Sequence, residues 1–280
     1  MKNVGYYNGE FAELSQLKIA ALDRAVYFGD GVYDVAFIHN RKPVALKDHL
    51  DRFFNSCKLL KIDIDKSYEQ MEQIFNSLIE KADPSENDFI LYWQMSRGIG
   101  YRNHVFPDCK TPSLFAYIVP KKIGDQSIRV KLITHEDNRF YFCNIKTINL
   151  IPNVLASETA KEAGCYEAIF HRGNMVTEGS HTSTLIIKHG VVITSPLSNL
   201  ILPSITRKHI LEICRENNIP CEEREFTLDE LFDADEILVA STTSVILAAD
   251  EIDGKKAGGK NPELVKKLQD LYFDKYGLNA

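Results

Sequence analysis

The sequence lacks several features that mark common classes of protein. In its 280 residues no run of eighteen apolar residues occurs, and the first residues, MKNVGYYNGEF, contain no apolar segment of the kind found in signal peptides. These absences argue against a membrane span and a secretory signal, so we expect a cytoplasmic protein. Internal repeats and low-complexity tracts are also lacking, which argues against fibrous, repeat and disordered architectures.

An excess of positive charge is lacking as well. The chain has 33 Lys and Arg against 39 Asp and Glu, which gives a formal net charge of −6, and the two signs are interspersed. Proteins that bind nucleic acids or anionic membranes carry a basic stripe or cluster, and none is present here. We therefore expect small molecules as partners, with no nucleic acid and no membrane.

Paired cysteine motifs are the third absence. No CxxC pair occurs, and several cysteines lie in apolar helical patterns, as reduced and buried thiols do. The pattern predicts neither disulfides nor a zinc site, and we expect no metal. The cysteines are Cys57, Cys109, Cys143, Cys165, Cys214 and Cys221.

The chain is long enough, at 280 residues with 44% hydrophobic residues, for a large core and two domains. A polar, turn-rich segment, PKKIGDQS, separates an α/β pattern from a second run of strands. We therefore expect an N-terminal domain over 1–119, a linker over 120–127 and a C-terminal domain over 128–280. In the first domain, residue periodicity predicts strands within 27–43 and over 89–95 and 113–119, with helices from Leu46 and over 68–81.

The second domain has the pattern of successive strands and hairpins with three helices. Strands are predicted over 128–136, 142–150, 167–172, 175–179, 184–196 and 236–242. Helices are predicted over 154–164, 205–218 and 261–273, the last with Asn261 as its cap and Pro262 in its first turn.

Two residues of this second half suggest chemistry. Lys146 lies in the apolar, strand-like run NIKTINLI, and Glu178 lies in VTEGS at the edge of a predicted hairpin. Taken alone, a strand lysine usually faces solvent and Glu-Gly-Ser is usually a turn. A desolvated lysine can instead form a Schiff base, and a carboxylate can keep a pyridine nitrogen protonated. Together the two residues suggest pyridoxal 5'-phosphate.

Six segments, in order along almost the whole chain, resemble the fold-type IV pyridoxal-phosphate enzymes. This family contains D-amino acid and branched-chain aminotransferases and aminodeoxychorismate lyase. The resemblance implies an α+β protein with a small N-terminal α/β domain and a larger C-terminal domain of mixed, barrel-like β structure with helices. The segments are DRAVYFGDGVYD at 23–34, HLDR at 49–52, NIKTINL at 144–150, GCYEAIFHRGNMVTEGS at 164–180, ILPSITR at 201–207 and STTS at 241–244.

The resemblance also assigns residues to the cofactor. It implies that Lys146 forms the Schiff base and later moves the substrate proton, while Glu178 contacts the pyridine nitrogen. A phosphate dianion needs a guanidinium and helix N-terminal amides, and the resemblance places it at Arg52, Ile205, Thr206 and Thr242, with Leu202 packed on the ring. Without the resemblance, Arg52 would be a surface helix arginine and Thr206 a helix cap.

A carboxylate-binding set distinguishes members of the family. Arg102 and His104 lie two apart in RGIGYRNHVFP, so an extended loop directs both side chains the same way. The resemblance implies that they bind the substrate α-carboxylate with Tyr33, act from the neighbouring subunit of a homodimer, and are joined by Thr243 and His181 at the substrate. It therefore implies a D-amino acid transaminase that moves the amino group of D-alanine or D-glutamate to a 2-oxo acid, by a ping-pong cycle through pyridoxamine phosphate.

Other functions remain open at this point. His181, Ser183 and Ser204 depart from the residues that the family commonly has, which bears on substrate range. A branched-chain L-amino acid aminotransferase or an aminodeoxychorismate lyase would keep Lys146 and Glu178 but would not need the basic pair. A noncatalytic ligand-binding protein of the same fold is a more distant alternative.

Overall fold

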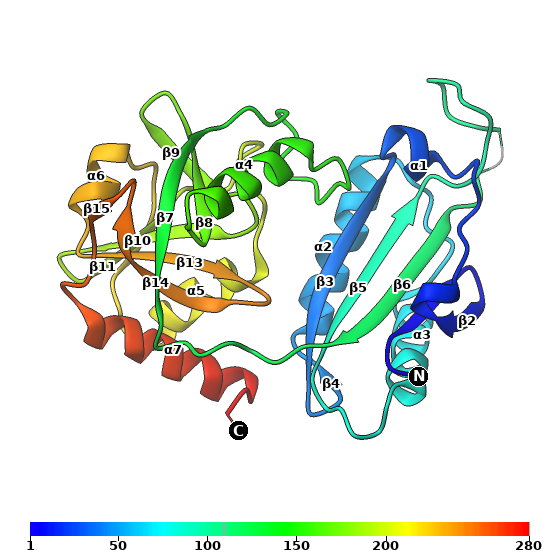
Figure 1. The fold of residues 1–280 in the computed structure, drawn as a ribbon, viewed down its shortest axis with the longest axis horizontal. Helices are drawn as coiled ribbons and strands as arrows, with labels where there is room; N and C mark the ends of the chain where they lie inside the picture. The colour runs from blue at the N-terminus through cyan, green and yellow to red at the C-terminus, as the bar shows by residue number, and fades with distance from the viewer. Residues whose placement is uncertain (109, 280) are drawn as a thin grey trace. The chain divides into compact units, whose positions relative to one another are not determined.

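The computed structural model describes residues 1–108 and 110–279, so Cys109 lies outside the described residues. The chain packs into two compact units (Figure 1), which are described separately below. Unit 1 is Met1–Lys122 with Ile145–Asn149, and unit 2 is Ile123–Asn144 with Leu150–Ala280. The domain limits expected from the sequence, with a linker over 120–127, stay a prediction. No helix among the described residues is long and apolar enough to cross a membrane.

Unit 1 is built on a six-stranded antiparallel sheet with the order β2-β1-β6-β5-β3-β4. A tight turn joins β3 to β4, where Asn40 and Arg41 both have positive φ, 49° and 60°, as a two-residue hairpin requires. The strands are β1 (Val4–Tyr7), β2 (Glu10–Glu13), β3 (Gly31–His39), β4 (Lys42–Pro43), β5 (Phe89–Ser96) and β6 (Ser113–Pro120).

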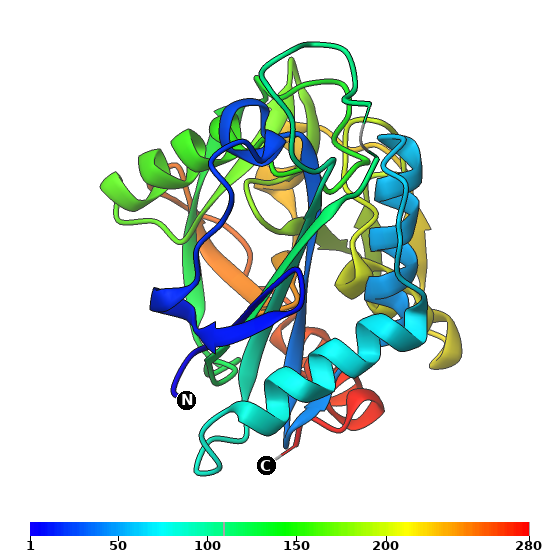
Figure 2. The same ribbon diagram turned by 90° about the vertical axis from the view of Figure 1, so that its right-hand side faces the viewer.

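Two long helices, α2 (Leu46–Leu59) and α3 (Tyr68–Lys81), cover one face of this sheet (Figures 1 and 2). The start of α3 is fixed by a capping box in which Ser67 and Gln70 satisfy each other's backbone amides. A one-turn 3-10 helix, η1 (Leu14–Gln16), follows β2, and the short helix α1 (Arg24–Phe28) precedes β3.

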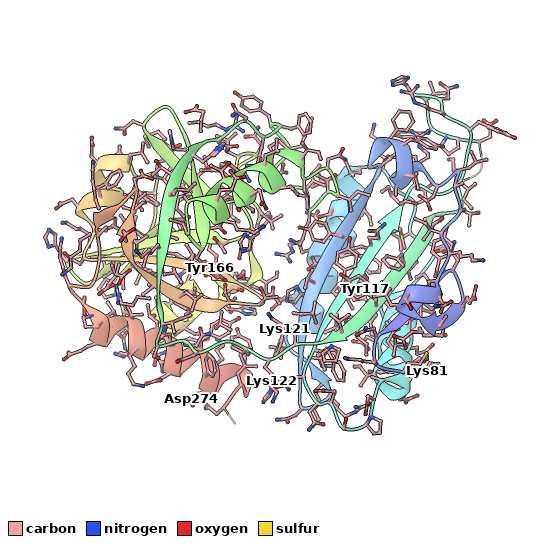
Figure 3. All side chains as sticks on the ribbon, viewed as in Figure 1. Lys81, Tyr117, Lys121, Lys122, Tyr166 and Asp274 are labelled. Atoms are coloured by element: carbon pink, nitrogen blue, oxygen red, sulfur yellow. The ribbon has the colours of Figure 1, made fainter. Side chains whose placement is uncertain are left out.

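The alternation of side chains along β5 divides unit 1 into a core and a second, partly exposed face. Leu91, Trp93 and Met95 are fully buried under α2 and α3. Tyr92 and Gln94 alternate with them and are only half-buried. The second face is aromatic, and Tyr117 on β6 belongs to it (Figure 3).

Unit 2 contains a nine-stranded mixed sheet with the order β12-β11-β10-β13-β14-β7-β8-β9, and β15 pairs with β14. Its parallel pairs are β7 with β14, β7 with β8, and β11 with β12. The strands are β7 (Arg129–Glu136), β8 (Glu167–Arg172), β9 (Met175–Gly179), β10 (Ser183–Lys188), β11 (Val191–Thr194), β12 (Cys221–Glu223), β13 (Glu236–Ser241), β14 (Val245–Ile252) and β15 (Lys255–Lys256). The helices are α4 (Ile151–Glu162), α5 (Ile205–Glu216), α6 (Leu228–Asp233) and α7 (Pro262–Tyr276).

Most predicted elements are confirmed, and α3 spans the predicted 68–81. Two predictions are wrong. Tyr27 belongs to α1 and not to a strand, because Asp23 caps this helix at the Ala25 amide and Gly29, with φ 59°, ends it. The predicted strand over 142–150 is an irregular segment, in which only Thr147 forms a bridge, to Val32.

Candidate active site

Lys146 belongs to unit 1 although the residues before and after its segment belong to unit 2. Its backbone is held at the beginning of β3, because Tyr33 N–H donates to Lys146 O at 2.9 Å and Ile148 N–H donates to Gly31 O at 3.1 Å. The Lys146 amide in turn donates to Ser56 Oγ of α2 at 3.2 Å. This short pairing replaces the predicted strand and fixes the lysine next to Tyr33.

The Lys146 amine lies over an aromatic ring. Its Nζ is 4.3 Å from the centroid of Tyr33, a distance typical of a cation–π contact. Lys146 is half-buried, and its charge acts to lower the pKa of His49 on α2, although burial is the larger cause of that shift. Of the residues predicted for the site, the structure therefore brings Lys146 and Tyr33 together.

Arg52 is buried, at 9% exposure, so it is not the surface arginine that its helical position alone suggested. Its Nε and Nη2 donate to the two oxygens of Asp34 at 2.8 and 2.7 Å. His49 Nδ1 lies 2.9 Å from the same carboxylate. Burial opposes ionisation of Asp34, yet Arg52 and His49 hold the pKa of that carboxyl well below its usual range.

The loop that carries Arg102 and His104 extends beyond α1, at the top of unit 1 in Figure 1. Both side chains are exposed and both lie against Phe28 of α1. The Arg102 guanidinium is 5.1 Å from the Phe28 centroid, and the His104 ring is 5.3 Å from it. The structure thus places both side chains against the same ring, and within the described residues no hydrogen bond or ring contact joins them to Tyr33.

The base of this loop is fixed by buried arginines. Arg24 donates to Asp30 Oδ2 at 2.7 Å and to the carbonyl oxygens of Asn103 and Val105 at 2.8 and 3.3 Å. Arg97 donates to both oxygens of Asp30 at 2.9 Å. Despite burial, the two guanidinium groups lower the pKa of Asp30, so an ionised carboxylate anchors the loop.

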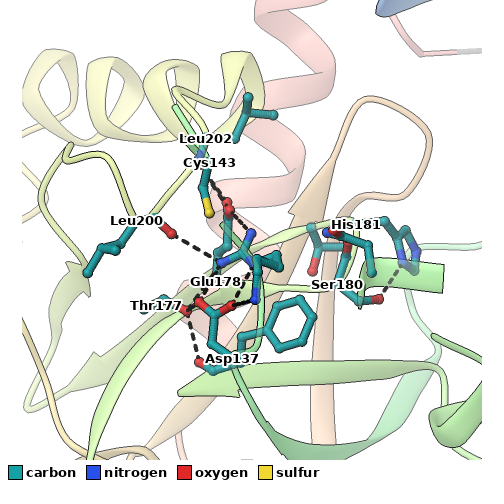
Figure 4. A network of polar contacts seen from close by, with 12 residues as sticks. Asp137, Cys143, Thr177, Glu178, Ser180, His181, Leu200 and Leu202 are labelled. Carbon is teal, nitrogen blue, oxygen red and sulfur yellow. Dashed lines mark hydrogen bonds and ion pairs between the residues drawn. The ribbon is translucent and has the colours of Figure 1, made fainter. Parts of the chain in front are cut away.

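In unit 2, Glu178 is buried at the end of β9 and accepts hydrogen bonds from two directions (Figure 4). Arg139 Nη1 donates to Oε1 at 2.5 Å, and Leu202 N–H donates to Oε2 at 3.0 Å. The sequence did not point to Arg139, since a lone arginine in EDNRF carries no motif. Burial raises the pKa of Glu178, while Arg139 acts in the opposite direction.

Arg139 serves a second carboxylate, Asp137. Its Nε and Nη2 donate to Asp137 at 2.9 Å each, and Arg172 Nε and Thr177 Oγ1 donate to the same group at 3.1 Å each. Asp137 therefore has more donors than Glu178. Its pKa is lowered in spite of burial, because Arg139 and Arg172 both lie against it.

The segment from Leu202 leads into α5. Ser204 caps the helix by accepting from Arg207 N–H at 3.2 Å. Within residues 1–108 and 110–279, neither Ile205 N–H nor Thr206 N–H donates a hydrogen bond. Two helix N-terminal amides in a buried setting are suited to bind an anion. The predicted residues Leu202, Ile205 and Thr206 thus lie in one continuous stretch beside the Glu178 carboxylate.

Thr242 and Thr243 occupy the turn between β13 and β14. Ser241 Oγ lies 2.7 Å from Ser244 Oγ and 3.3 Å from Thr243 Oγ1, which makes the turn a cluster of hydroxyl groups. Thr242 makes no side-chain hydrogen bond within the described part of the chain. The turn therefore presents at least one hydroxyl for a ligand.

His181 follows Glu178 by three residues and pairs with a different carboxylate. Its Nδ1 lies 3.0 Å from Oε2 of Glu167, whose side chain is fully buried while that of His181 is 49% exposed. Glu167 also accepts from Ser180 Oγ, and from Thr182 Oγ1 at 2.9 Å. Although burial opposes it, these donors lower the pKa of Glu167. The sequence singled out His181 but not its partner.

Comparison with known proteins identifies the family. The model of amino-transferase class IV matches residues 31–252. A D-alanine aminotransferase of Staphylococcus aureus is 36% identical to the chain, and the alignment covers 97% of this chain and 96% of the relative. A D-alanine aminotransferase of Bacillus licheniformis is also 36% identical, over 94% of this chain and 93% of the relative.

Solved structures agree on the fold. An Escherichia coli branched-chain amino acid aminotransferase gives a TM-score of 0.89 at 19% identity, covering 100% of this chain and 97% of its own. A branched-chain aminotransferase from the thermophilic archaeon Thermoproteus uzoniensis, solved with norvaline, gives 0.87 at 22% identity, covering 99% and 95%. The fold class predicted from the sequence is confirmed, and the chain belongs to the class IV aminotransferases.

Proposed function

We propose that this aminotransferase acts on D-amino acids, transferring the amino group of a donor such as D-alanine or D-glutamate to a 2-oxo acid. The observation that carries this proposal is that Arg102 and His104 both lie against the Phe28 ring, since a guanidinium and an imidazole from one loop suit a carboxylate. The name that the relatives at 36% identity bear, D-alanine aminotransferase, supports it.

The residues of the chain fit pyridoxal 5'-phosphate as cofactor. Unit 1 offers a half-buried lysine amine, and unit 2 offers the Glu178 carboxylate, whose pKa burial raises and which a protonated ring nitrogen would therefore stabilise as an anion. The amides of Ile205 and Thr206, the Thr242 hydroxyl and Arg52 would hold the phosphate, and Leu202 would pack on the ring.

When bound, the cofactor supplies an electron sink that makes the α-proton of the substrate acidic. Lys146 has two tasks in this proposal: its amine holds the cofactor, and after displacement by the substrate it takes the proton from the α-carbon and returns it elsewhere. The Tyr33 ring under Nζ limits where the amine can move. A fixed amine acts on one face of the substrate only, so stereochemistry follows from the side on which the carboxylate binds.

Substrate binding is assigned to Tyr33, Arg102, His104, Thr243 and His181. We propose that Arg102 and His104 act in the site of a second subunit of a homodimer, which is consistent with their exposure at Phe28. Mixing Lys146→Ala subunits with Arg102→Ala subunits would then restore part of the activity. A cytoplasmic location stays a prediction.

The half-reaction tests the function. The cofactor-loaded protein is mixed with D-alanine, D-glutamate, L-leucine or aminodeoxychorismate, and the absorbance of the cofactor is followed. We expect conversion by the two D-amino acids and none by Lys146→Ala, which lacks the amine. Conversion by L-leucine alone or by aminodeoxychorismate alone would assign the chain to the other branches of the family, and a colourless protein that borohydride leaves unchanged would indicate a binding protein.

A further inference from the structure

The second face of the unit 1 sheet carries one polar side chain among aromatic rings. Tyr33 stacks on Tyr92 at 5.6 Å between centroids, and Tyr92 stacks on Tyr117 at 4.9 Å. Gln94 lies on the same face of β5, two residues from Tyr92 and half-buried. A glutamine in such a position needs partners for both ends of its amide.

The oxygen end of that amide has a partner. The Tyr92 hydroxyl donates to Gln94 Oε1 at 2.7 Å, which orients the carboxamide. Within residues 1–108 and 110–279, Gln94 Nε2 donates no hydrogen bond. Burial, with Tyr33 and Tyr117 as smaller causes, raises the pKa of Tyr92, so its hydroxyl keeps the proton that it donates. Both N–H groups of the amide are therefore available to a ligand.

The register places Gln94 next to the tyrosine that contacts Lys146. Gln94 pairs directly with Tyr33 across β5 and β3. Side chains that face each other in an antiparallel pair have Cβ atoms roughly 5 Å apart. Lys146 Nζ lies 4.3 Å from the centroid of that same Tyr33 ring. A substrate held at Lys146 and Tyr33 thus comes within reach of the Gln94 carboxamide.

We propose that Gln94 is a further substrate-binding residue, whose amide nitrogen donates to a carboxylate of the amino acid or 2-oxo acid bound at Lys146. This inference rests on the proposed function, because it requires a carboxylate substrate at the lysine. Each substrate of this kind has an α-carboxylate, and D-glutamate and 2-oxoglutarate have a second one. An amide donor can bind either carboxylate. Comparing a substrate that has the second carboxylate with one that lacks it shows which of the two Gln94 binds.

The test compares Gln94→Leu, which removes the donor at similar volume, with Gln94→Glu, which replaces it by an acceptor of negative charge. Gln73→Glu on the exposed side of α3 makes the same charge change elsewhere and serves as control. The readouts are KM and kcat for D-alanine and D-glutamate, and the Kd of pyruvate and 2-oxoglutarate for the cofactor-loaded protein by calorimetry, which requires no turnover.

We expect KM and Kd to rise about 10- to 100-fold in both Gln94 variants, as loss of a hydrogen bond to a charged group predicts, with kcat changed less than about threefold. If KM or Kd rises equally for all four compounds, Gln94 binds the α-carboxylate. If the rise is confined to D-glutamate and 2-oxoglutarate, Gln94 binds the second carboxylate. Tyr92→Phe, which frees the amide to rotate, should raise the same constants by a smaller factor.

Unchanged KM and Kd in Gln94→Leu would overturn the inference, as would a fall in kcat and in thermal stability at constant KM. Failure of the proposed function looks different, because the wild-type protein itself would then not react with D-alanine or D-glutamate. The pyruvate and 2-oxoglutarate affinities of wild-type and variant protein still test Gln94 in that case.

Discussion

Two buried carboxylates, Asp34 of unit 1 and Glu178 of unit 2, are held in opposite ways. In unit 1, Asp34 faces two groups that can be cationic, Arg52 and His49, within 2.9 Å. In unit 2, Glu178 shares one cation, Arg139, with Asp137, which has Arg172 in addition. The pKa of Asp34 falls accordingly, whereas burial raises that of Glu178.

The difference fits a structural role for Asp34 and the ligand-binding role that we propose for Glu178. A buried anion surrounded by donors is stable without further partners. Removing it leaves the buried cation without a counter-charge, which destabilises the folded state. A buried carboxylate whose ionised form is incompletely compensated gains from a further cationic donor. By this reasoning Asp34 holds α2 on β3, and the raised pKa of Glu178 supports the role that we propose for it at a protonated ring nitrogen.

The strongest way to break this comparison is to remove the shared cation. Arg139→Met leaves Glu178 and Asp137 close together with one arginine fewer, and we expect a loss of about 3–5 kcal/mol in unfolding free energy, the usual cost of breaking a buried pair. Urea unfolding measures it. Arg172→Met, at the more exposed arginine, is the matched control and should cost clearly less. Equal losses of unfolding free energy in the two variants would mean that Arg139 stabilises the cluster no more than Arg172 does.

Asp34→Asn tests the unit 1 side. The amide keeps the shape but leaves Arg52 and His49 without their anion, so we expect a loss of about 3 kcal/mol at pH 7. Because the folded-state pKa of Asp34 is lowered, its contribution is complete above the ordinary aspartate value, 3.8, and disappears as the pH falls below it. The variant and wild-type unfolding curves should therefore converge in acid.

Asp51→Asn is the control for this substitution, because Asp51 lies on α2 next to Arg52 but is 45% exposed in its ion pair with Lys47. An exposed pair contributes less than about 1 kcal/mol. A loss in Asp34→Asn no larger than in Asp51→Asn would show that the buried cluster does not stabilise unit 1.

Glu178→Gln should separate activity from stability. We expect kcat to fall roughly 10²- to 10³-fold, as when one preorganised electrostatic contact is lost. Because the folded-state pKa of Glu178 is raised, the wild-type protein loses stability as the pH rises above the ordinary glutamate value, 4.5, and through the raised pKa. The cofactor-free variant should therefore become more stable relative to wild type as the pH rises above 4.5.

Glu167→Gln, in the same unit, should show the opposite sign. The pKa of Glu167 is lowered, so its ionised form stabilises the fold and the variant should lose more at pH 8 than in acid. If both variants follow the same pH trend, the two carboxylates do not differ in the way proposed here.

Local sequence was sufficient where structure depends on neighbours along the chain. The span of α3 follows from its apolar spacing and from Ser67 and Gln70 at its start. The prediction of a strand around Lys146 was wrong because this segment pairs with the sheet only at Thr147. That pairing depends on Val32, more than a hundred residues earlier in the chain. Tertiary contact overrode β propensity.

The partners of the buried ion pairs could not be predicted from local sequence either, because they are far apart along the chain. Asp34 and Arg52 are 18 residues apart, and Glu178 and Arg139 are 39 apart. Charged residues are seldom buried unless they are paired, so a sequence without the pairing places them on the surface. The motif named Glu178, Arg52 and His181, and only the structure named Arg139, Asp34 and Glu167.

His181→Ser is the mildest test, because it removes a half-exposed partner from a carboxylate that keeps its other donors. Such a pair contributes less than about 1 kcal/mol, so the unfolding free energy should hardly change. If His181 contacts the substrate side chain, loss of a group that can carry positive charge should lower kcat/KM for D-glutamate relative to D-alanine by roughly tenfold or less. His189→Ser at an exposed turn should leave this ratio unchanged. An unchanged ratio in His181→Ser as well would confine His181 to the Glu167 cluster and leave substrate range to the other residues proposed to bind the substrate.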